Sequence, residues 1–356
     1  MSIAAFFHGQ PPSFSRRFPP RTRYFRRTEI PFFWMTPPAH DALTTNSGAS
    51  RPLVAVVGPT GSGKTDLALS IAEVFDGELV GCDSLQIYRY LDIGTARTPL
   101  AERRGMPHHM MDLVDPDRIY TAGDYARDAR AVLAGISGRE KLPVVAGGTG
   151  FYLRALLEGL FAGPQRDEAL RARLTAIEKA RAGFLHRLLR RLDKPAASRI
   201  HPNDLPKLIR AIEVCLLRRR PMSAQFEDGR NRLSGYRVLK IGLAPPRAEL
   251  CRRLDRRLAD MFARGLIDEV RGILARGFSR NVKPMESIGY KEALAVVEGR
   301  IEPDQALAAA QLATRQYAKR QMTWFRREKD VVWLDGFGDD LAVRNAAFHL
   351  VRSFGT

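Results

Sequence analysis

The chain has 356 residues, enough for one large domain or two ordinary ones, and 45% of them are hydrophobic, which is normal for a globular protein. Lys and Arg number 57 against 39 Asp and Glu, which gives a formal net charge of +18. This surplus favours a polyanionic partner, with nucleic acid ahead of an anionic membrane surface, although a merely solvated basic surface would give the same count.

The sequence offers little for disulfides, zinc binding or membrane insertion. The three cysteines, Cys82, Cys215 and Cys251, are too scattered for a disulfide framework, and the chain has no C-x-x-C pair. No apolar run approaches the length of a membrane span. We therefore expect a cytoplasmic protein with reduced thiols and no membrane segment.

The first fifty residues differ from the rest of the chain. Residues 1–50 combine Pro, Ser, Phe and Arg with only two acidic residues, Glu29 and Asp41. Such a stretch cannot build a core, so we expect a disordered basic extension; an organellar transit peptide is the alternative, although a clear amphipathic period is missing. Met35 offers a second start for translation. We exclude this stretch from the fold.

From residue 51 onward, expected strands and helices alternate. Apolar runs at 53–57, 79–82, 142–146 and 236–243 predict strands, and helical spacing predicts helices over 65–75, from Tyr125, from Glu249 and over 305–327. Thr121 and Asp124 have the spacing of a capping box ahead of the second helix. The alternation predicts an α/β fold in which helices flank a parallel sheet.

Residues 165–230 interrupt this alternation. Their pattern is helical and basic, with arginines interleaved with Leu and Ile. We expect an α-helical insertion here, with approximate boundaries, between two parts of a core at 51–164 and 231–338. Residues 339–356 are expected to be a C-terminal tail.

The clearest motif is G-x-x-x-x-G-K-[ST] between the first strand and the first helix, where a P-loop belongs. It comprises Gly58, Pro59, Thr60, Gly61, Ser62, Gly63, Lys64 and Thr65. In such loops the glycines let backbone N–H groups converge on phosphate oxygens, the lysine adds a charge and the last hydroxyl can bind Mg²⁺. A glycine turn with an accidental lysine is the alternative, and the flanking elements argue against it. The motif alone leaves the identity of the phosphate open.

Asp83 stands at the carboxyl end of the second expected strand, where open α/β sheets bind their ligands. It is a candidate general base or metal ligand, or simply the cap of the next helix. His108, His109 and His201 lack the Cys or carboxylate spacing of a metal site, so we expect structural or RNA-contacting roles for them.

Several motifs together resemble bacterial tRNA dimethylallyltransferases. The stretch 83–89 with 92–96 carries the most distinctive of them, and others lie in order along the chain at 107–109, 147–149, 156–160, 199–204, 210–214, 289–290 and 314–321. The resemblance spans roughly residues 54–334. Shared order over several unlike motifs is far more specific than a P-loop match.

The resemblance implies a reaction and roles for several residues. Enzymes of this family move a dimethylallyl group from dimethylallyl diphosphate to the exocyclic amine of the adenine that follows the anticodon. The P-loop would then hold the diphosphate, with Mg²⁺ at Thr65, and Asp83 matches the general base. Thr149 matches a contact to the target nucleotide and also suits a helix N-cap. Arg257 matches an arginine near the diphosphate, with a solvated helix face as the alternative.

The resemblance also implies a surface for the anticodon stem-loop of tRNA. The matching positions are Asp83, Ser84, Leu85, Gln86, Thr149, Arg171, Pro206, Lys207, Leu208, Ile209, Arg210, Glu286, Ser287, Ile288, Gly289, Tyr290 and Lys291. Tyr90 stands where the family commonly has glycine, and the zinc-finger extension of eukaryotic relatives is absent. No heptad seam is visible, so a monomer is expected.

Two other function classes stay open at this point. A small-molecule kinase also combines a P-loop with an acidic residue after the second strand, and an RNA-dependent ATPase would use the same loop without covalent chemistry on RNA. The absence of a carboxylate at the end of the run 142–146, which leads into Gly147 and Gly148, argues against the ATPase.

Overall fold

The computed structural model describes residues 50–355 apart from residue 162 and residues 226–230. The expected basic extension, including Met35, lies outside the described residues except for Ser50. Among the described residues, no helix is both long enough and apolar enough to cross a membrane.

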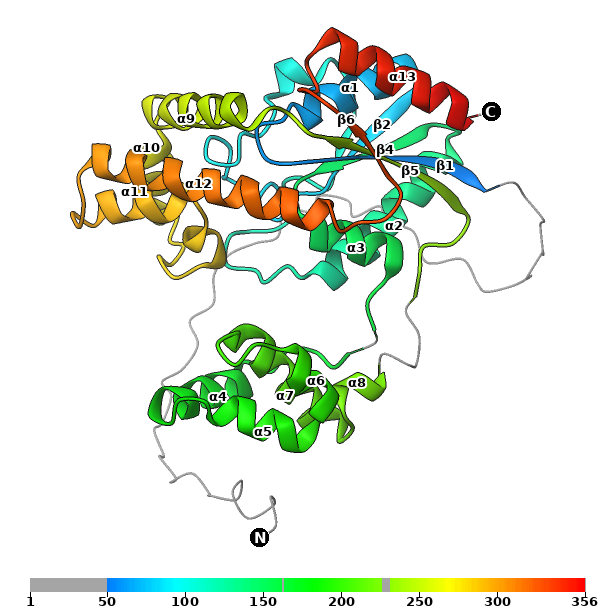
Figure 1. Ribbon diagram of the computed structural model, residues 1–356. Helices are drawn as coiled ribbons and strands as arrows, with labels where there is room; N and C mark the ends of the chain where they lie inside the picture. The colour runs from blue at the N-terminus through cyan, green and yellow to red at the C-terminus, as the bar shows by residue number, and fades with distance from the viewer. Residues whose placement is uncertain (1–49, 162, 226–230, 356) are drawn as a thin grey trace, which may run out of the picture. The chain divides into compact units, whose positions relative to one another are not determined.

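A parallel sheet forms the centre of the core (Figure 1). Its strand order is β3-β2-β4-β1-β5-β6, and every pairing between neighbours is parallel. The expected α/β fold with a parallel sheet is confirmed. The strands are β1 (Arg51–Val57), β2 (Gly77–Gly81), β3 (His108–His109), β4 (Leu142–Gly147), β5 (Tyr236–Leu243) and β6 (Val331–Leu334).

The central strands are apolar on both faces because helices cover both faces. In β1, Leu53, Ala55 and Val57 belong to one buried cluster, and Val54 and Val56 to another. The first cluster includes α2 (Ala122–Gly138) and α3 (Gly150–Glu158), and the second includes α1 (Lys64–Val74) and α13 (Leu341–Gly355). A continuous apolar run is therefore the pattern that a central strand of this sheet requires.

The expected C-terminal tail is wrong for most of its length. Residues 341–355 form the helix α13, which buries Val343, Ala347 and Val351 against the sheet. These residues recur every fourth position, which is the helical spacing of an apolar stripe. The last described segment is thus part of the core.

Four helices between β5 and β6 pack on one another beside the sheet (Figure 1). They are α9 (Arg247–Ala263), α10 (Leu266–Ala275), α11 (Tyr290–Val297) and α12 (Pro303–Phe325). A short 3-10 helix, Lys283–Glu286, precedes α11. Leu258, Met261 and Phe325 bring this group into the same buried cluster as α2 and α3.

The basic insertion is helical and has a core of its own. It consists of α4 (Glu168–Ala180), α5 (Phe184–Leu192), α6 (Lys194–Arg199), α7 (Leu205–Arg218) and α8 (Met222–Gln225). Leu174, Leu185, Leu189 and Leu208 lie in one buried cluster. Because this unit buries its own apolar faces, most of its arginines are left exposed on its surface.

The turn after β4 leaves no room for a side chain at Gly147. A Cβ atom there would lie 2.0 Å from the carbonyl oxygen of Cys82. We expect Gly147→Ala to lower the free energy of unfolding by about 1–3 kcal/mol, the usual cost of overpacking. Gly272→Ala, in the open on α10, should instead raise it by up to about 1 kcal/mol. Urea denaturation of both variants checks the pair, and equal effects would contradict this packing.

Candidate phosphate and acceptor site

The P-loop lies between β1 and α1 as expected, and its free amides point to an anion site. Gly63, with φ of 80°, is the N-cap of α1, and no side chain caps this helix. Within the described residues, the amides of Gly63, Lys64 and Thr65 donate no hydrogen bond. Unpaired N–H groups at a helix N-terminus attract phosphate oxygens.

Two basic side chains meet at this loop, and neither forms an ion pair with an acidic residue in the part of the chain that the structure describes. Among the described residues, Lys64 donates only to the carbonyl of Pro59, at 2.6 Å. Arg257, on α9, is partly buried and makes no hydrogen bond or ion pair within the described residues. Burial, and next the charge of Arg257, lower the pKa of Lys64 to about 7. Two close, partly buried cations are stabilised when an anion binds between them.

The segment after β6 lies against the P-loop. The amide of Gly338 donates to Ser62 at 2.8 Å, and a Cβ atom on Gly338 would lie 2.1 Å from the carbonyl oxygen of Gly63. Arg253, on α9, holds Asp339 through two hydrogen bonds of 2.7 and 3.1 Å and stacks on the ring of Phe337 at 3.8 Å. Residues 337–339 therefore support the phosphate loop.

One glutamine joins the P-loop to the turn after β4. The side-chain oxygen of Gln321, on α12, accepts from the amide of Thr60 at 2.8 Å, and its nitrogen donates to Gly148 at 2.9 Å. Gln321 is 6% exposed, so both bonds are shielded from water. A Cβ atom on Gly148 would lie 2.3 Å from this nitrogen. Glycine is therefore needed for the bridge.

Asp83 and Thr149 meet at the carboxyl ends of β2 and β4. The Oδ1 atom of Asp83 accepts from the amides of Leu85 at 2.8 Å and Gln86 at 3.4 Å, and its other oxygen accepts no hydrogen bond from the described residues. The Thr149 hydroxyl accepts from the amide of Ser84 at 3.1 Å. Thr149 occupies the N-cap position of α3, but its side chain does not cap the helix. One carboxylate oxygen thus orients the turn, and the other is available for chemistry.

Comparison with known proteins identifies the family. The model of the family described as IPP transferase matches residues 86–328. This chain belongs to the IPP transferase family. The tRNA dimethylallyltransferase of Solibacter usitatus is 60% identical over 303 residues, which cover 85% of this chain and 99% of that protein. The corresponding protein of Koribacter versatilis is 53% identical over 306 residues, with the same two shares.

Solved structures agree with this assignment. The tRNA isopentenylpyrophosphate transferase of Bacillus halodurans has a TM-score of 0.62 and 34% identity, over 86% of this chain and 95% of that one. A eukaryotic dimethylallyltransferase acting on tRNA has a TM-score of 0.72 and 27% identity, over 86% of this chain and 79% of that one. The resemblance drawn from the motifs is confirmed.

The positions expected to bind tRNA fall into two groups in the structure. Leu208 and Ile209 are buried in the core of the helical unit, and Arg171 and Arg210 both pair with the fully buried Glu213. Burial opposes ionisation of Glu213, but its hydrogen bonds to the two arginines lower its pKa. These four side chains therefore hold the unit together. Pro206 and Lys207, at the start of α7, are exposed.

The expected contacts before α11 divide in the same way. Glu286 and Lys291 are exposed, whereas Gly289 and Tyr290 are buried. Ser287 donates to the carbonyl of Pro284 at 2.5 Å, and Ile288 is partly exposed. In this segment only the exposed side chains and the backbone are accessible to an RNA.

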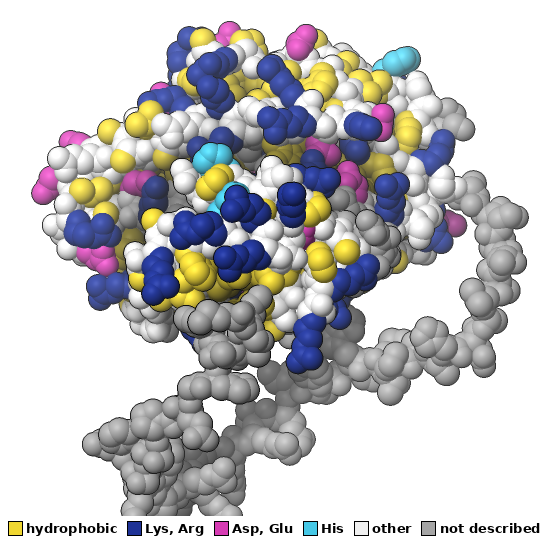
Figure 2. All heavy atoms as spheres, turned by 60° about the horizontal axis from the view of Figure 1, so that its bottom comes forward, with side chains coloured by type: hydrophobic (Ala, Val, Ile, Leu, Met, Phe, Trp, Pro, Cys, Tyr) yellow, Lys and Arg dark blue, Asp and Glu magenta, His cyan; other side chains and the backbone are white. Residues whose placement is uncertain are grey.

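One basic surface was missed by the sequence analysis. An open hollow of ≈ 440 Å³ on α12 is lined by Gln316, Lys319, Arg320, Thr323, Trp324 and Arg327. Lys319 and Arg327 are exposed and form no ion pair within the described residues. The sequence signal that could have indicated this surface is the helical spacing of Lys319, within the motif at 314–321, and Arg327, which follows that motif. The face of the molecule seen in Figure 2 carries many basic and few acidic side chains.

The low pKa of Lys64 predicts a pH-dependent affinity. Above pH 7 an increasing share of Lys64 is neutral in the free protein. A diphosphate, which is ionised throughout this range, favours the charged lysine, so binding takes up a proton and weakens by up to tenfold per pH unit. Calorimetry with dimethylallyl diphosphate from pH 7 to 9, in two buffers, measures both effects. In Lys64→Arg, which stays charged, a slope that persists would refute this origin.

Proposed function

We propose that this protein transfers a dimethylallyl group from dimethylallyl diphosphate to the N6 amine of the adenine 3′ of the anticodon in tRNA, releasing diphosphate. The observation that carries the proposal is the pairing of two sites at one edge of the sheet. Within the described residues, Lys64 and Arg257 at the P-loop form no ion pair, and one carboxylate oxygen of Asp83 at the end of β2 accepts no hydrogen bond. An anionic leaving group and a proton acceptor are the two requirements of this reaction.

Each site has its own part in the bond changes. The bond between the first carbon of the prenyl group and the diphosphate oxygen breaks, and its electron pair leaves with the diphosphate. The N6 lone pair forms the new bond to that carbon. Asp83 accepts the proton that N6 loses, which assists because the adenine amine is a weak nucleophile. Lys64, Arg257 and the P-loop amides stabilise the charge that develops on the diphosphate.

The P-loop also suits Mg²⁺. Within the described residues, the hydroxyl of Thr65 makes no hydrogen bond, and no group of three His, Cys, Asp or Glu side chains is placed to hold a metal by itself. A metal here would therefore be held by Thr65 together with the diphosphate oxygens. When bound, Mg²⁺ would neutralise part of the leaving group's charge.

The kinase and ATPase alternatives have less support. The family and the relatives named above act in prenyl transfer or on tRNA by name. After β4 the chain runs through Gly147 and Gly148, which pack against Cys82 and Gln321 and leave no carboxylate at this position. Neither alternative accounts both for a candidate proton acceptor at Asp83 and for an exposed surface rich in Lys and Arg side chains.

The RNA surface would combine segments of different kinds. We place the stem-loop on the exposed basic side chains of the helical unit and of α12, where phosphate contacts need charge but no fixed geometry. The target adenine must leave its stack to reach Asp83. We take the protein to act as a monomer in the cytoplasm.

The test compares prenyl transfer by the wild type with that of two variants at Asp83. Purified protein is incubated with Mg²⁺, labelled dimethylallyl diphosphate and an anticodon stem-loop with consecutive adenines, and label in RNA is counted. Asp83→Asn keeps an oxygen for the amides of Leu85 and Gln86 but is no base. We expect its kcat to fall by about 10²- to 10⁴-fold while diphosphate affinity persists. Asp83→Ala should lose at least as much.

The controls separate the alternatives. Absence of transfer by the wild type, with ATP consumed instead, would support a kinase or ATPase. Transfer that survives Asp83→Asn at more than a tenth of the wild-type rate would remove Asp83 from the role of base but not the reaction.

The hollow on α12 predicts a salt effect. Arg327→Ala removes one exposed cation, so RNA affinity should fall about equally for all stem-loop sequences, and the slope of log affinity against log salt should decrease by about one. Fluorescence anisotropy at several salt concentrations measures the slope. Arg326→Ala, at the adjacent exposed position outside the hollow, is the control. A salt slope for Arg327→Ala that is unchanged from the wild type would exclude a phosphate contact at Arg327.

A further inference from the structure

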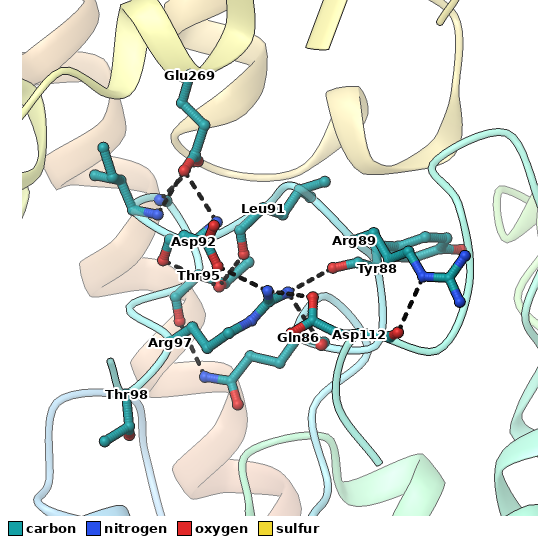
Figure 3. A network of polar contacts seen from close by, with 12 residues as sticks. Gln86, Tyr88, Arg89, Leu91, Asp92, Thr95, Arg97, Thr98, Asp112 and Glu269 are labelled. Carbon is teal, nitrogen blue, oxygen red and sulfur yellow. Dashed lines mark hydrogen bonds and ion pairs between the residues drawn. The ribbon is translucent and has the colours of Figure 1, made fainter. Parts of the chain in front are cut away.

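A carboxylate from α10 holds the loop that follows Asp83 (Figure 3). The two oxygens of Glu269 accept from three successive backbone amides, those of Asp92 at 2.9 Å, Ile93 at 2.7 Å and Gly94 at 3.2 Å. Bonds from backbone N–H groups to a carboxylate are stronger than neutral ones. Successive amides converging on one carboxylate fix the backbone of this loop.

The same carboxylate also binds Tyr290. The Tyr290 hydroxyl donates to Glu269 Oε1 at 2.6 Å, and the ring of Tyr290 is fully buried. A Cβ atom on Gly94 would lie 2.5 Å from this ring, so the loop and the ring are in direct contact. Glu269 thus ties the loop at 92–94 to the start of α11.

Arg97 connects the loop that Glu269 holds to the turn at Asp83. Its guanidinium, 5% exposed, pairs with Asp92 at 2.7 Å and with Asp112, and donates to the carbonyls of Tyr88 at 2.5 Å and Gln86 at 3.3 Å. Figure 3 shows it at the centre of these partners. The Gln86 side chain also donates to the carbonyl of Thr95 at 3.1 Å. Because the Gln86 amide donates to Asp83, an unbroken chain of polar contacts runs from Glu269 to Asp83.

We propose that Glu269 is a positioning residue for the RNA acceptor. It joins the segment 83–86 to the segment 286–291, two stretches that would meet the RNA, and holds them in one arrangement. The diphosphate cradle is built on other contacts, those of Gln321 and Gly338. Glu269 therefore acts on the RNA side of the reaction, and this inference rests on the proposed function.

A merely structural role would affect both substrates alike, so the test compares them. Glu269→Gln removes the charge and replaces one of the two acceptor oxygens by an NH2 donor, so the three amides can no longer all be satisfied. We expect the KM for the stem-loop to rise about tenfold, as for the loss of one charge-assisted hydrogen bond, with the KM for dimethylallyl diphosphate unchanged. Asp268→Asn is the matched control, since Asp268 is the exposed neighbour on α10 and, among the residues that the structure describes, pairs only with Arg271, at 2.6 Å. It should match the wild type.

Tyr290→Phe tests whether the effect passes through Glu269. Its side chain is buried and cannot touch RNA, so removing the hydroxyl should raise the stem-loop KM in the same direction but less. The double variant should raise the stem-loop KM no more than Glu269→Gln alone does, because both changes disrupt the same contact between Tyr290 and Glu269. Additive losses would contradict a shared route.

The outcomes are distinct from those for the overall reaction. Anisotropy with the labelled stem-loop gives the RNA affinity even if no transfer is detected, so a failed reaction leaves this test intact. Equal stem-loop affinity in Glu269→Gln and Asp268→Asn would overturn the inference. Equal loss of affinity for RNA and for diphosphate in Glu269→Gln would also overturn it, since that result indicates general loss of structure.

Discussion

The distance between the phosphate cradle and the acceptor side depends on one buried amide, that of Gln321. It bonds to Thr60 in the P-loop and to Gly148 in the turn after β4, and these loops leave neighbouring strands of the sheet. Reactions between two bound groups need their atoms held within a narrow range of separations, and small displacements are costly. A side chain that is satisfied at both ends, and shielded from water, fixes such a separation better than two loops that each find their own partners.

Around this bridge, the charges are arranged by function. In the described part of the chain, Lys64 and Arg257 on the P-loop side have no bonded acid, and one oxygen of Asp83 on the acceptor side accepts no hydrogen bond. Burial lowers the pKa of both cations, although the charge of Asp83 partly offsets this for each. Holding the two cations close therefore costs free energy in the free protein, and an anion bound between them would relieve this cost. Part of the binding energy of an anionic substrate comes from this relief.

Local patterns predicted the elements nearest the chemistry. Short motifs and apolar runs, each only a few residues long, were enough to predict the P-loop, the strands at 53–57 and 142–146 and the position of Asp83. The edge strands β3 and β6 are too short for a periodic signal, and α13, expected to be a tail, follows a turn rich in glycine and acidic residues. The pairing of Arg171 with Glu213 and the burial of Leu208 and Ile209 could not be predicted, for another reason. A basic amphipathic helix looks the same whether its arginine meets RNA or a buried glutamate, and Glu213 lies 42 residues from Arg171.

The contact of Gly338 with Ser62 has a consequence for how the protein is made. The P-loop is synthesised early and the turn that supports it late, since β6 and α13 follow almost all other described residues. A ribosome-bound chain that has folded β1, β2 and β4 still lacks the backbone that packs on Gly63. The nascent chain would therefore acquire its phosphate site only near the end of translation, and a prematurely terminated product would keep most of the sheet but not a finished cradle.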